Sequence, residues 1–161
     1  MREAAGDAAA RMIGLRAANA ALDRLRETRR GPMLERTQSA FRQMTGAAWT
    51  GLETRPEGTG ERLVALRDDE IVNAEGMSQG TRGQLYLSLR LAGHALFCDE
   101  AGPLPFVTDD VLETFDDERA AAALDLTMQL GQRGQAILLT HHRHLVDMAK
   151  GRIPDLHVID L

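Results

Sequence analysis

Two residue pairs in the C-terminal half of the chain have side chains that bind metal ions or move protons. Asp109 and Asp110 end the apolar segment PLPFVTDD, and His141 and His142 end the apolar segment AILLTHH. We interpret both segments as buried strands of a parallel sheet, in which ligands bind beyond the carboxyl ends of the strands. If these strands are neighbours, the four side chains converge, although each pair alone also fits a turn or a solvated strand end. Carboxylates that hold Mg²⁺ through water and orient a nucleophilic water, with a histidine that contacts phosphate, make up a phosphoryl-transfer set.

A second candidate site lies upstream, in the stretch GMSQGTRGQLYLSLRLAGHALF (76–97). Ser78 and the glycines Gly80 and Gly83 stand at the start of a helix predicted over about 79–97. A helix start needs one capping residue such as Ser and gains nothing from nearby glycines. Small residues do allow another backbone or a phosphate to approach the first helical N–H groups. At this point tight packing and phosphate contact both explain the glycines.

The N-terminal part of the chain is expected to be helical. Residues 1–30 are rich in Ala, Arg, Leu and Glu. The 3-4-3 spacing that is typical of a coiled-coil seam is found for Leu15, Ala18, Leu22 and Leu25. Because this seam covers only about two heptads, an ordinary amphipathic helix explains it equally well. The pair Gly31-Pro32 is expected to end this helix, with a second helix over about 33–44.

The rest of the chain predicts an α/β layer. Short apolar runs punctuated by Gly, Pro and Asp over 46–77 predict two or three short strands. The helix that follows has apolar residues on two sides, which predicts that it is buried. Strands are then predicted at about 106–108, 136–142 and 156–161, with helices between them at about 117–131 and 144–150. Short crossovers between apolar strands indicate a parallel sheet flanked by helices.

The composition restricts the class of protein. The chain has 161 residues, 43% of them hydrophobic, which suffices for the core of one domain. Its formal net charge of -5 provides no basic footprint for DNA, so a nucleic-acid contact would need a local patch or protein outside this sequence. The single cysteine, Cys98, suits a reducing cytoplasm, and no apolar run reaches the roughly 20 residues of a membrane span. We therefore expect a cytoplasmic protein with no membrane partner.

Four stretches, which occur in the right order and span residues 32–149, resemble motifs of ABC-type ATPase heads of the SMC-like and YhaN-like kind. MSQGTRGQLYLSLRLA (77–92) resembles their signature motif. PLPFVTDDVLETFDDERA (103–120) looks like their Walker B strand, catalytic acid and D-loop. AILLTHHRHLVDMA (136–149) resembles their switch-histidine strand. PMLERTQSAFRQMTGAAWTGL (32–52) is similar to the YhaN-like stretch that joins coiled coil to head.

The resemblance implies a fold and a division of the chain. The fold would be α/β, the C-terminal lobe of an ABC-type P-loop ATPase head, with a parallel sheet flanked by helices. Residues 1–45 would be a helical segment at the exit of a coiled coil. Residues 46–161 would be the lobe itself, which carries the signature motif, the Walker B strand, the D-loop and the switch histidine.

The same resemblance implies roles for the residues that could do chemistry. Asp109 would be the Walker B aspartate that holds Mg²⁺ through its water shell, and Asp110 would orient the attacking water. The switch histidine would be His141 by the SMC-like alignment and His142 by the YhaN-like pattern, so both are candidates. The residues that would bind the γ-phosphate of an ATP held by the opposite subunit, or form the D-loop, are Ser78, Gln79, Gly80, Thr81 and Asp116.

The phosphate-cradling Walker A motif, Gly-x-x-x-x-Gly-Lys-[Ser/Thr], does not occur in the sequence. The resemblance therefore implies the C-terminal half of a larger ATPase, in which ATP and Mg²⁺ bind only with the N-terminal Walker A lobe present. This chain alone is then expected to be inactive. Its implied partners are that lobe, a second head in an ATP-bound homodimer and, by family analogy with DNA repair or chromosome maintenance, DNA.

Two alternatives stay open. A stand-alone Mg²⁺-dependent hydrolase or nuclease would use Asp109, Asp110 and Asp116, with Ser78 serving only as a helix cap. A noncatalytic interaction module would dimerise through its N-terminal helices. Mg²⁺-dependent cleavage by this chain without nucleotide would identify the first of these.

Overall fold

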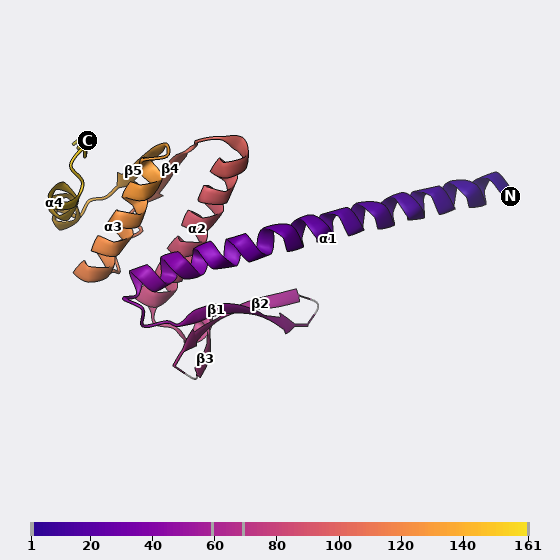
Figure 1. The fold of residues 1–161 in the computed structure, drawn as a ribbon, viewed down its shortest axis with the longest axis horizontal. Coiled ribbons are helices and arrows are strands. Elements are labelled where there is room, and N and C mark those ends of the chain that lie inside the picture. The colour runs from indigo at the N-terminus through magenta and orange to yellow at the C-terminus, as the bar shows by residue number, and fades with distance from the viewer. Residues whose placement is uncertain (1, 59, 69, 161) are drawn as a thin grey trace. The chain divides into compact units, whose positions relative to one another are not determined.

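A computed structural model describes residues 2–58, 60–68 and 70–160 of this protein (Figure 1). In the first helix, the side chains described before Thr28 are those of Leu15, Arg16, Asn19, Ala20 and Arg24. The chain divides into two compact units, Met1–Pro32 and Met33–Leu161. No helix in the described ranges is long and apolar enough to cross a membrane.

The first element is one long helix, α1 (Arg2–Met44), which contains Pro32. The prediction that Gly31-Pro32 separates two helices is therefore wrong. A proline removes one backbone donor from a helix interior, but its fixed φ is compatible with the helix. The residues just after Pro32 are held by packing, which contributes most of the stability of helices in proteins. Met33 reaches Gly93, where its Cε lies 3.6 Å from the position of an added Cβ, and Arg36 pairs with Asp99 at 2.6 Å.

The coiled-coil seam in α1 stays a prediction. Leu15 is 63% exposed, as expected of a seam residue without a partner helix and equally of a solvated face. The side chains of Ala18, Leu22 and Leu25 lie outside the described residues. The coiled-coil and amphipathic-helix interpretations of this segment are both still open.

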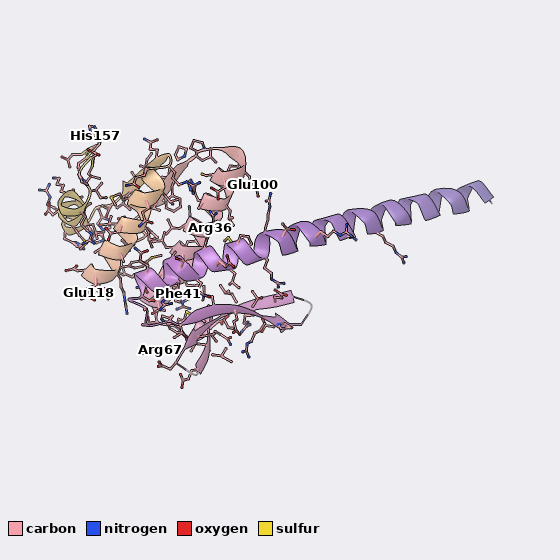
Figure 2. The ribbon with its side chains drawn as sticks, viewed as in Figure 1. Arg36, Phe41, Arg67, Glu100, Glu118 and His157 are labelled. Atoms are coloured by element: carbon pink, nitrogen blue, oxygen red, sulfur yellow. The ribbon has the colours of Figure 1, made fainter. Side chains whose placement is uncertain are left out.

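A three-stranded antiparallel sheet, in the order β1-β2-β3, follows α1. Its strands are β1 (Gly51–Glu57), β2 (Gly60–Arg67) and β3 (Glu70–Asn73), which confirms the strands predicted over 46–77. Phe41 of α1, labelled in Figure 2, is 1% exposed and lies 5.8 Å from Trp49 between ring centroids. These two rings anchor a core cluster that also contains Leu52, Ala65, Met77 and Leu85.

The second half of the chain consists of alternating helices and strands (Figure 1). A short 3₁₀ turn, Ala74–Gly76, leads into α2 (Gln79–Ala101). Four elements follow: β4 (Pro105–Asp109), α3 (Asp117–Gly131), β5 (Gln135–Leu139) and α4 (Arg143–Arg152). β4 and β5 pair in parallel, with α3 as the crossover between them. The α/β class, the parallel pairing and the bounds of the helix predicted over 117–131 are confirmed.

The two faces of the β4–β5 sheet differ in burial. Phe106 is 3% exposed and belongs to a core cluster with apolar side chains of α2, α3 and α4, including Leu87, Leu124 and Leu145. On the opposite face Val107 and Leu139 are 46% and 41% exposed. This alternation follows from the period of two residues in a strand. The helices described here therefore cover one face of the parallel sheet and leave apolar side chains on the other.

The strand predicted over 156–161 is not present in residues 156–160, and Leu161 lies outside the described residues. Val158 and Ile159 are 38% and 71% exposed. A strand is stable when its N–H and C=O groups pair with a neighbouring strand, and β4 and β5 pair only with each other among the described residues. An apolar, β-branched segment without such a neighbour does not form a strand.

Asp99, near the end of α2, connects two other elements through ion pairs. Its carboxylate accepts a hydrogen bond from Arg36 of α1 at 2.6 Å and another from Arg133 in the turn after α3. The hydrogen bonds from Arg133 and then Arg36 hold the pKa of Asp99 below its ordinary value of 3.8. A carboxylate whose pKa is lower in the folded state stabilises the fold above its unfolded pKa. The contribution of Asp99 is therefore present at neutral pH and is lost as the pH falls below 3.8.

We expect Asp99→Asn to lower the urea midpoint of unfolding at neutral pH, with a gap from wild type that narrows as the pH falls below 3.8. The loss will be modest, because both arginines and Asp99 are partly exposed to solvent. Urea titrations between about pH 2.5 and 7 check this expectation. Glu35→Gln, which removes an exposed carboxylate of α1, is the control for net charge. A gap of the same size in acid and at neutral pH would contradict the assignment.

Candidate functional site

The carboxyl ends of β4 and β5 lie side by side, so the sequence correctly placed the two polar pairs at one edge of the sheet. Asp109 is in register with Leu139, and the Asp110 N–H donates to the Leu139 carbonyl at 3.0 Å. Asp110 has a φ of +45°, in the left-handed region that Asp tolerates better than most side chains. The chain turns out of the strand at this residue, and the carboxylate faces the segment after β5.

Asp110 and His141 form a direct contact within this site. His141 Nδ1 lies 2.7 Å from Asp110 Oδ2, and the His141 backbone N–H donates to Oδ1 at 3.2 Å. The hydrogen bond from the His141 ring is the main cause that lowers the pKa of Asp110 below its ordinary value of 3.8. Asp110 is therefore ionised at neutral pH. Because a carboxylate only accepts, Nδ1 is the donor, and the Nε2 atom of His141 is left for another partner.

His142 packs against the same pair. The ring centroids of His141 and His142 are 4.0 Å apart, and the His142 backbone N–H donates to Thr140 Oγ1 at 3.2 Å. The Nε2 atom of His142 is buried and has no hydrogen-bond partner in the described part of the chain. One ligand atom from each of Asp110, His141 and His142 lies within 4.8 Å of the other two. The fold thus gathers three of the four side chains that the sequence singled out.

Asp109 stands apart from this group. Its side chain lies on the exposed face of β4, and it makes no hydrogen bond or ion pair with the described residues. An exposed, unpaired carboxylate at the end of a strand is a hard oxygen ligand of the kind that Mg²⁺ binds, often through water. Asp109 therefore fits the Mg²⁺ role implied by the resemblance, and that role stays a prediction.

The candidate phosphate site is the N-terminus of α2. Ser78 caps this helix, since its Oγ accepts the Thr81 N–H at 3.2 Å and bonds to Thr81 Oγ1 at 2.9 Å. The N–H groups of Gln79 and Gly80, the first two of the helix, have no acceptor within the described ranges. Unpaired N–H groups at a helix N-terminus favour anions. This end of α2 is thus suited to a phosphate group such as that of ATP.

Close packing explains why Gly80 and Gly83 are glycines. A Cβ on Gly80 would lie 3.2 Å from the Thr114 carbonyl oxygen, and a Cβ on Gly83 would lie 3.2 Å from the Phe115 ring. The segment between β4 and α3 therefore rests directly on the first turns of α2. Of the two explanations for these glycines, tight packing is confirmed, whereas phosphate contact remains a prediction that concerns the N–H groups.

Asp116, the predicted D-loop aspartate, caps α3. Its Oδ1 accepts the Arg119 N–H at 2.9 Å, and its Oδ2 lies 3.3 Å from the Arg119 guanidinium. Among the described residues, Asp109, Asp110 and Asp116 do not form a group of neighbouring metal ligands. This arrangement disfavours the three-aspartate hydrolase that the sequence left open.

We expect Gly80→Val to destabilise the protein by about 1–3 kcal/mol, because the new methyl groups must displace the Thr114 carbonyl. Urea unfolding followed by circular dichroism measures the loss. Gly151→Ala is the matched control, since a Cβ at this helical glycine has nothing within 4 Å and should leave stability unchanged or raise it by up to about 1 kcal/mol. Equal stability of Gly80→Val and wild type would show that the loop does not pack on α2 as described.

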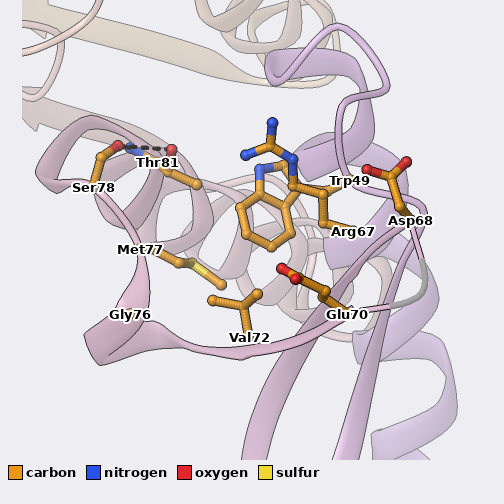
Figure 3. Close-up of a pocket in the computed structure, with 9 residues that line it drawn as sticks. All are labelled: Trp49, Arg67, Asp68, Glu70, Val72, Gly76, Met77, Ser78 and Thr81. Atoms are coloured by element: carbon orange, nitrogen blue, oxygen red, sulfur yellow. Dashed lines mark hydrogen bonds between the residues drawn. The ribbon is translucent and has the colours of Figure 1, made fainter.

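A hollow of about 620 Å³ lies beside the start of α2 (Figure 3). Ser78 and Thr81 line one side, and Trp49 lines another, with the Arg67 guanidinium 5.9 Å from its ring centroid. Asp68, Glu70, Val72, Gly76 and Met77 complete the wall. Arg67 and Glu70 lie on strands β2 and β3 with no motif around them, so the sequence alone carries no signal for either residue.

The fold is that of SMC ATPase head domains. A structure described as "Structural biochemistry of ATP-driven dimerization and DNA stimulated activation of SMC ATPases" matches with a TM-score of 0.63 at 16% identity, over 79% of this chain and 77% of that chain. An SMC head bound to the C-winged helix domain of ScpA matches with a TM-score of 0.59 at 16% identity, over 74% of this chain and 37% of that chain.

The amino-acid sequence is similar to YhaN of Bacillus subtilis, described as an uncharacterized protein. YhaN is 38% identical over 86 residues, which are 53% of this chain and 9% of YhaN. The uncharacterized protein Rv1278 of Mycobacterium tuberculosis is 40% identical over 73 residues, which are 45% of this chain and 8% of Rv1278. The chain thus spans less than a tenth of the length of these curated relatives. No protein-family model matches it. The predicted resemblance to SMC-like and YhaN-like ATPase heads is confirmed by this partial similarity and by the fold.

Proposed function

We propose that this chain supplies the signature, Walker B, D-loop and switch-histidine elements of an ATP-hydrolysing head in an SMC-like or YhaN-like ATPase. A Walker A lobe outside this sequence would hold most of the ATP, and two heads would close on it as a homodimer. The observation that carries the proposal is the contact of Asp110 with His141 at 2.7 Å, beyond the carboxyl ends of two parallel strands. The SMC-head fold gives it support at the level of architecture.

The exposed face of the β4–β5 sheet supports the proposal that a second lobe packs on it. Parallel sheets are covered on both faces in almost all proteins, yet Val107 and Leu139 are 46% and 41% exposed. Asp109 lies on the same face, in register with Leu139. A Walker A lobe that covers this face would bury the apolar side chains and bring its phosphates and Mg²⁺ beside Asp109.

In the proposed site Asp110 orients the attacking water and His141 contacts the γ-phosphate. Asp110 is suited to its role because its carboxylate is ionised at neutral pH and can accept a hydrogen bond from the water. We favour His141 over His142 as the switch histidine. The Nδ1 atom of His141 is engaged by Asp110 and its other nitrogen is left for phosphate, whereas Nε2 of His142 is buried.

The N-terminus of α2 would receive the γ-phosphate bound to the opposite head. The unpaired N–H groups of Gln79 and Gly80 support this assignment, since free N–H groups at a helix N-terminus attract anions. Ser78 and Thr81 would add their hydroxyl groups after a small change in the hydrogen bond that now joins them at 2.9 Å. This site is incomplete in one head, which is why the proposal includes a dimer.

DNA is the proposed regulator of this ATPase, in repair or chromosome maintenance. The support is indirect, because DNA-stimulated activation is described for the SMC ATPases whose fold this chain shares. The net charge of -5 argues that the DNA contact would be made largely by protein outside this sequence. The proposal therefore predicts DNA stimulation of the longer protein and little DNA binding by this chain.

ATP turnover measured at several protein concentrations tests the proposed function. The chain alone should not hydrolyse Mg²⁺-ATP, whereas the protein extended to its Walker A lobe should do so. The rate per molecule should rise with protein concentration, because two heads must meet to complete each site. If the extended protein neither binds nor hydrolyses ATP, the proposal is wrong. Mg²⁺-dependent nucleic-acid cleavage by the chain alone would instead support the hydrolase alternative.

A further inference from the structure

The cluster of Asp110, His141 and His142 has the donor set of a metal centre. We propose that these three side chains bind a divalent transition-metal ion such as Zn²⁺, at a site separate from the Mg²⁺ that Asp109 would hold. One ligand atom from each residue lies within 4.8 Å of the other two. The ligands follow directly after the paired parallel strands β4 and β5, which bring the two segments together.

The distances need only a small adjustment to accept an ion. Zn–N bonds of about 2.0–2.1 Å and Zn–O bonds of about 2.0–2.2 Å in a tetrahedral site place neighbouring donor atoms roughly 3.3 Å apart. Asp110 Oδ2 and His141 Nδ1 are 2.7 Å apart, so they must separate by about 0.6 Å. The side chain of His141 is 68% exposed and can make this movement. The ion would take the place of the proton on His141 Nδ1, and the neutral imidazole would then carry its proton on Nε2.

His142 supplies the observation that points to a ligand. Its Nε2 atom is buried without a hydrogen-bond partner among the described residues, and an unsatisfied buried polar atom costs about 1–3 kcal/mol. Such atoms are rare in folded proteins and call for an explanation, such as an ion. The neighbouring His144 ring meets the His142 ring edge to face, with 5.6 Å between the centroids, and it gives Nε2 no hydrogen bond. A bound metal would give the His142 imidazole a partner.

The chemistry of the donors selects the kind of ion. Two imidazoles and one carboxylate suit Zn²⁺, Co²⁺ or Ni²⁺, whereas Mg²⁺ prefers a shell of oxygen atoms. Three protein ligands leave a coordination position for water, which makes the site open rather than closed. Binding requires neutral imidazoles and an ionised carboxylate, so the affinity for the ion should fall in acid.

The proposed ion would also inhibit the proposed ATPase. Coordination would take Asp110 away from the attacking water and His141 away from phosphate. This consequence rests on the proposed function, whereas binding of the ion does not. The two parts can therefore be tested separately.

Isothermal titration of the metal-free chain with Zn²⁺ tests the binding. Cys98 should be changed to Ala in every sample, because its Sγ lies 3.7 Å from the His94 ring nitrogens and forms a second soft donor pair. We expect one Zn²⁺ per chain, an affinity at least about tenfold weaker in Asp110→Ala and in His142→Ala, and no competition from excess Mg²⁺. His157→Ala, which removes an exposed histidine outside the cluster, should bind as the parent does.

Unchanged Zn²⁺ affinity in Asp110→Ala and His142→Ala would overturn the proposal. Circular dichroism identifies a variant that fails to fold, and His141→Ala, which alters an exposed side chain, then replaces it. In the extended protein, Zn²⁺ should inhibit ATP turnover. Zn²⁺ binding that depends on the cluster in a protein without ATPase activity would refute the proposed function and leave the metal site standing. ATP turnover in a protein that does not bind Zn²⁺ here would refute the metal site alone.

Discussion

Asp110→Asn should lower Mg²⁺-dependent ATP turnover by about 10²–10⁴-fold in the protein extended to its Walker A lobe, while ATP binding survives. The amide cannot take up a proton from water, so its orienting and basic functions are lost together. The fold should tolerate the change, because Asn adopts positive φ readily and its Oδ1 can still accept the His141 N–H. Steady-state turnover and equilibrium binding of labelled ATP measure the two effects.

Asp147→Asn is the matched control for this prediction. Asp147 is an exposed residue of α4, outside the cluster at the strand ends. The substitution makes the same change in charge, and turnover should stay within about twofold of wild type. If the turnover of Asp110→Asn also stays within that range, Asp110 does not orient the attacking water.

Leu145→Ala should destabilise the chain by about 2–5 kcal/mol. Leu145 is 1% exposed and fixes α4 to the core cluster that contains Phe106 and Leu124. α4 begins directly after His142, and the Leu145 N–H donates to the His142 carbonyl, so a cavity at Leu145 should also disturb the position of the histidine pair. Urea unfolding measures the stability, and Zn²⁺ titration or ATP turnover in the appropriate protein measures the effect on the site.

Leu139→Ala makes the same chemical change on the uncovered face of the sheet. Because Leu139 is 41% exposed, the loss of stability in this chain should be about 0.5 kcal/mol or less. In the extended protein the same substitution should cost more, since the proposed Walker A lobe would bury this side chain. Equal losses for Leu139→Ala and Leu145→Ala in the chain alone would contradict the packing described here.

The local pattern of the sequence was enough to predict most elements and the residues at their ends. Strand signals placed β4 and β5, and the helix predicted over 117–131 has the bounds of α3. The motifs are local as well, so their resemblance to SMC-like and YhaN-like heads needed no tertiary information. These features are readable because periodicity, capping and strand-end chemistry depend on residues close together in the chain.

Tertiary structure decided the features that depend on residues distant in sequence. Asp110 and His141 are 31 residues apart and meet only because β4 and β5 pair in parallel in one register. Gly80 lies against the Thr114 carbonyl for the same kind of reason, and this contact shows that tight packing requires a glycine there. The helix through Pro32 and the missing strand at 156–160 were mispredicted because neighbours, not local propensity, determine both. Packing after Pro32 sustains α1, and Val158 and Ile159 have no neighbouring strand in the described residues to pair with.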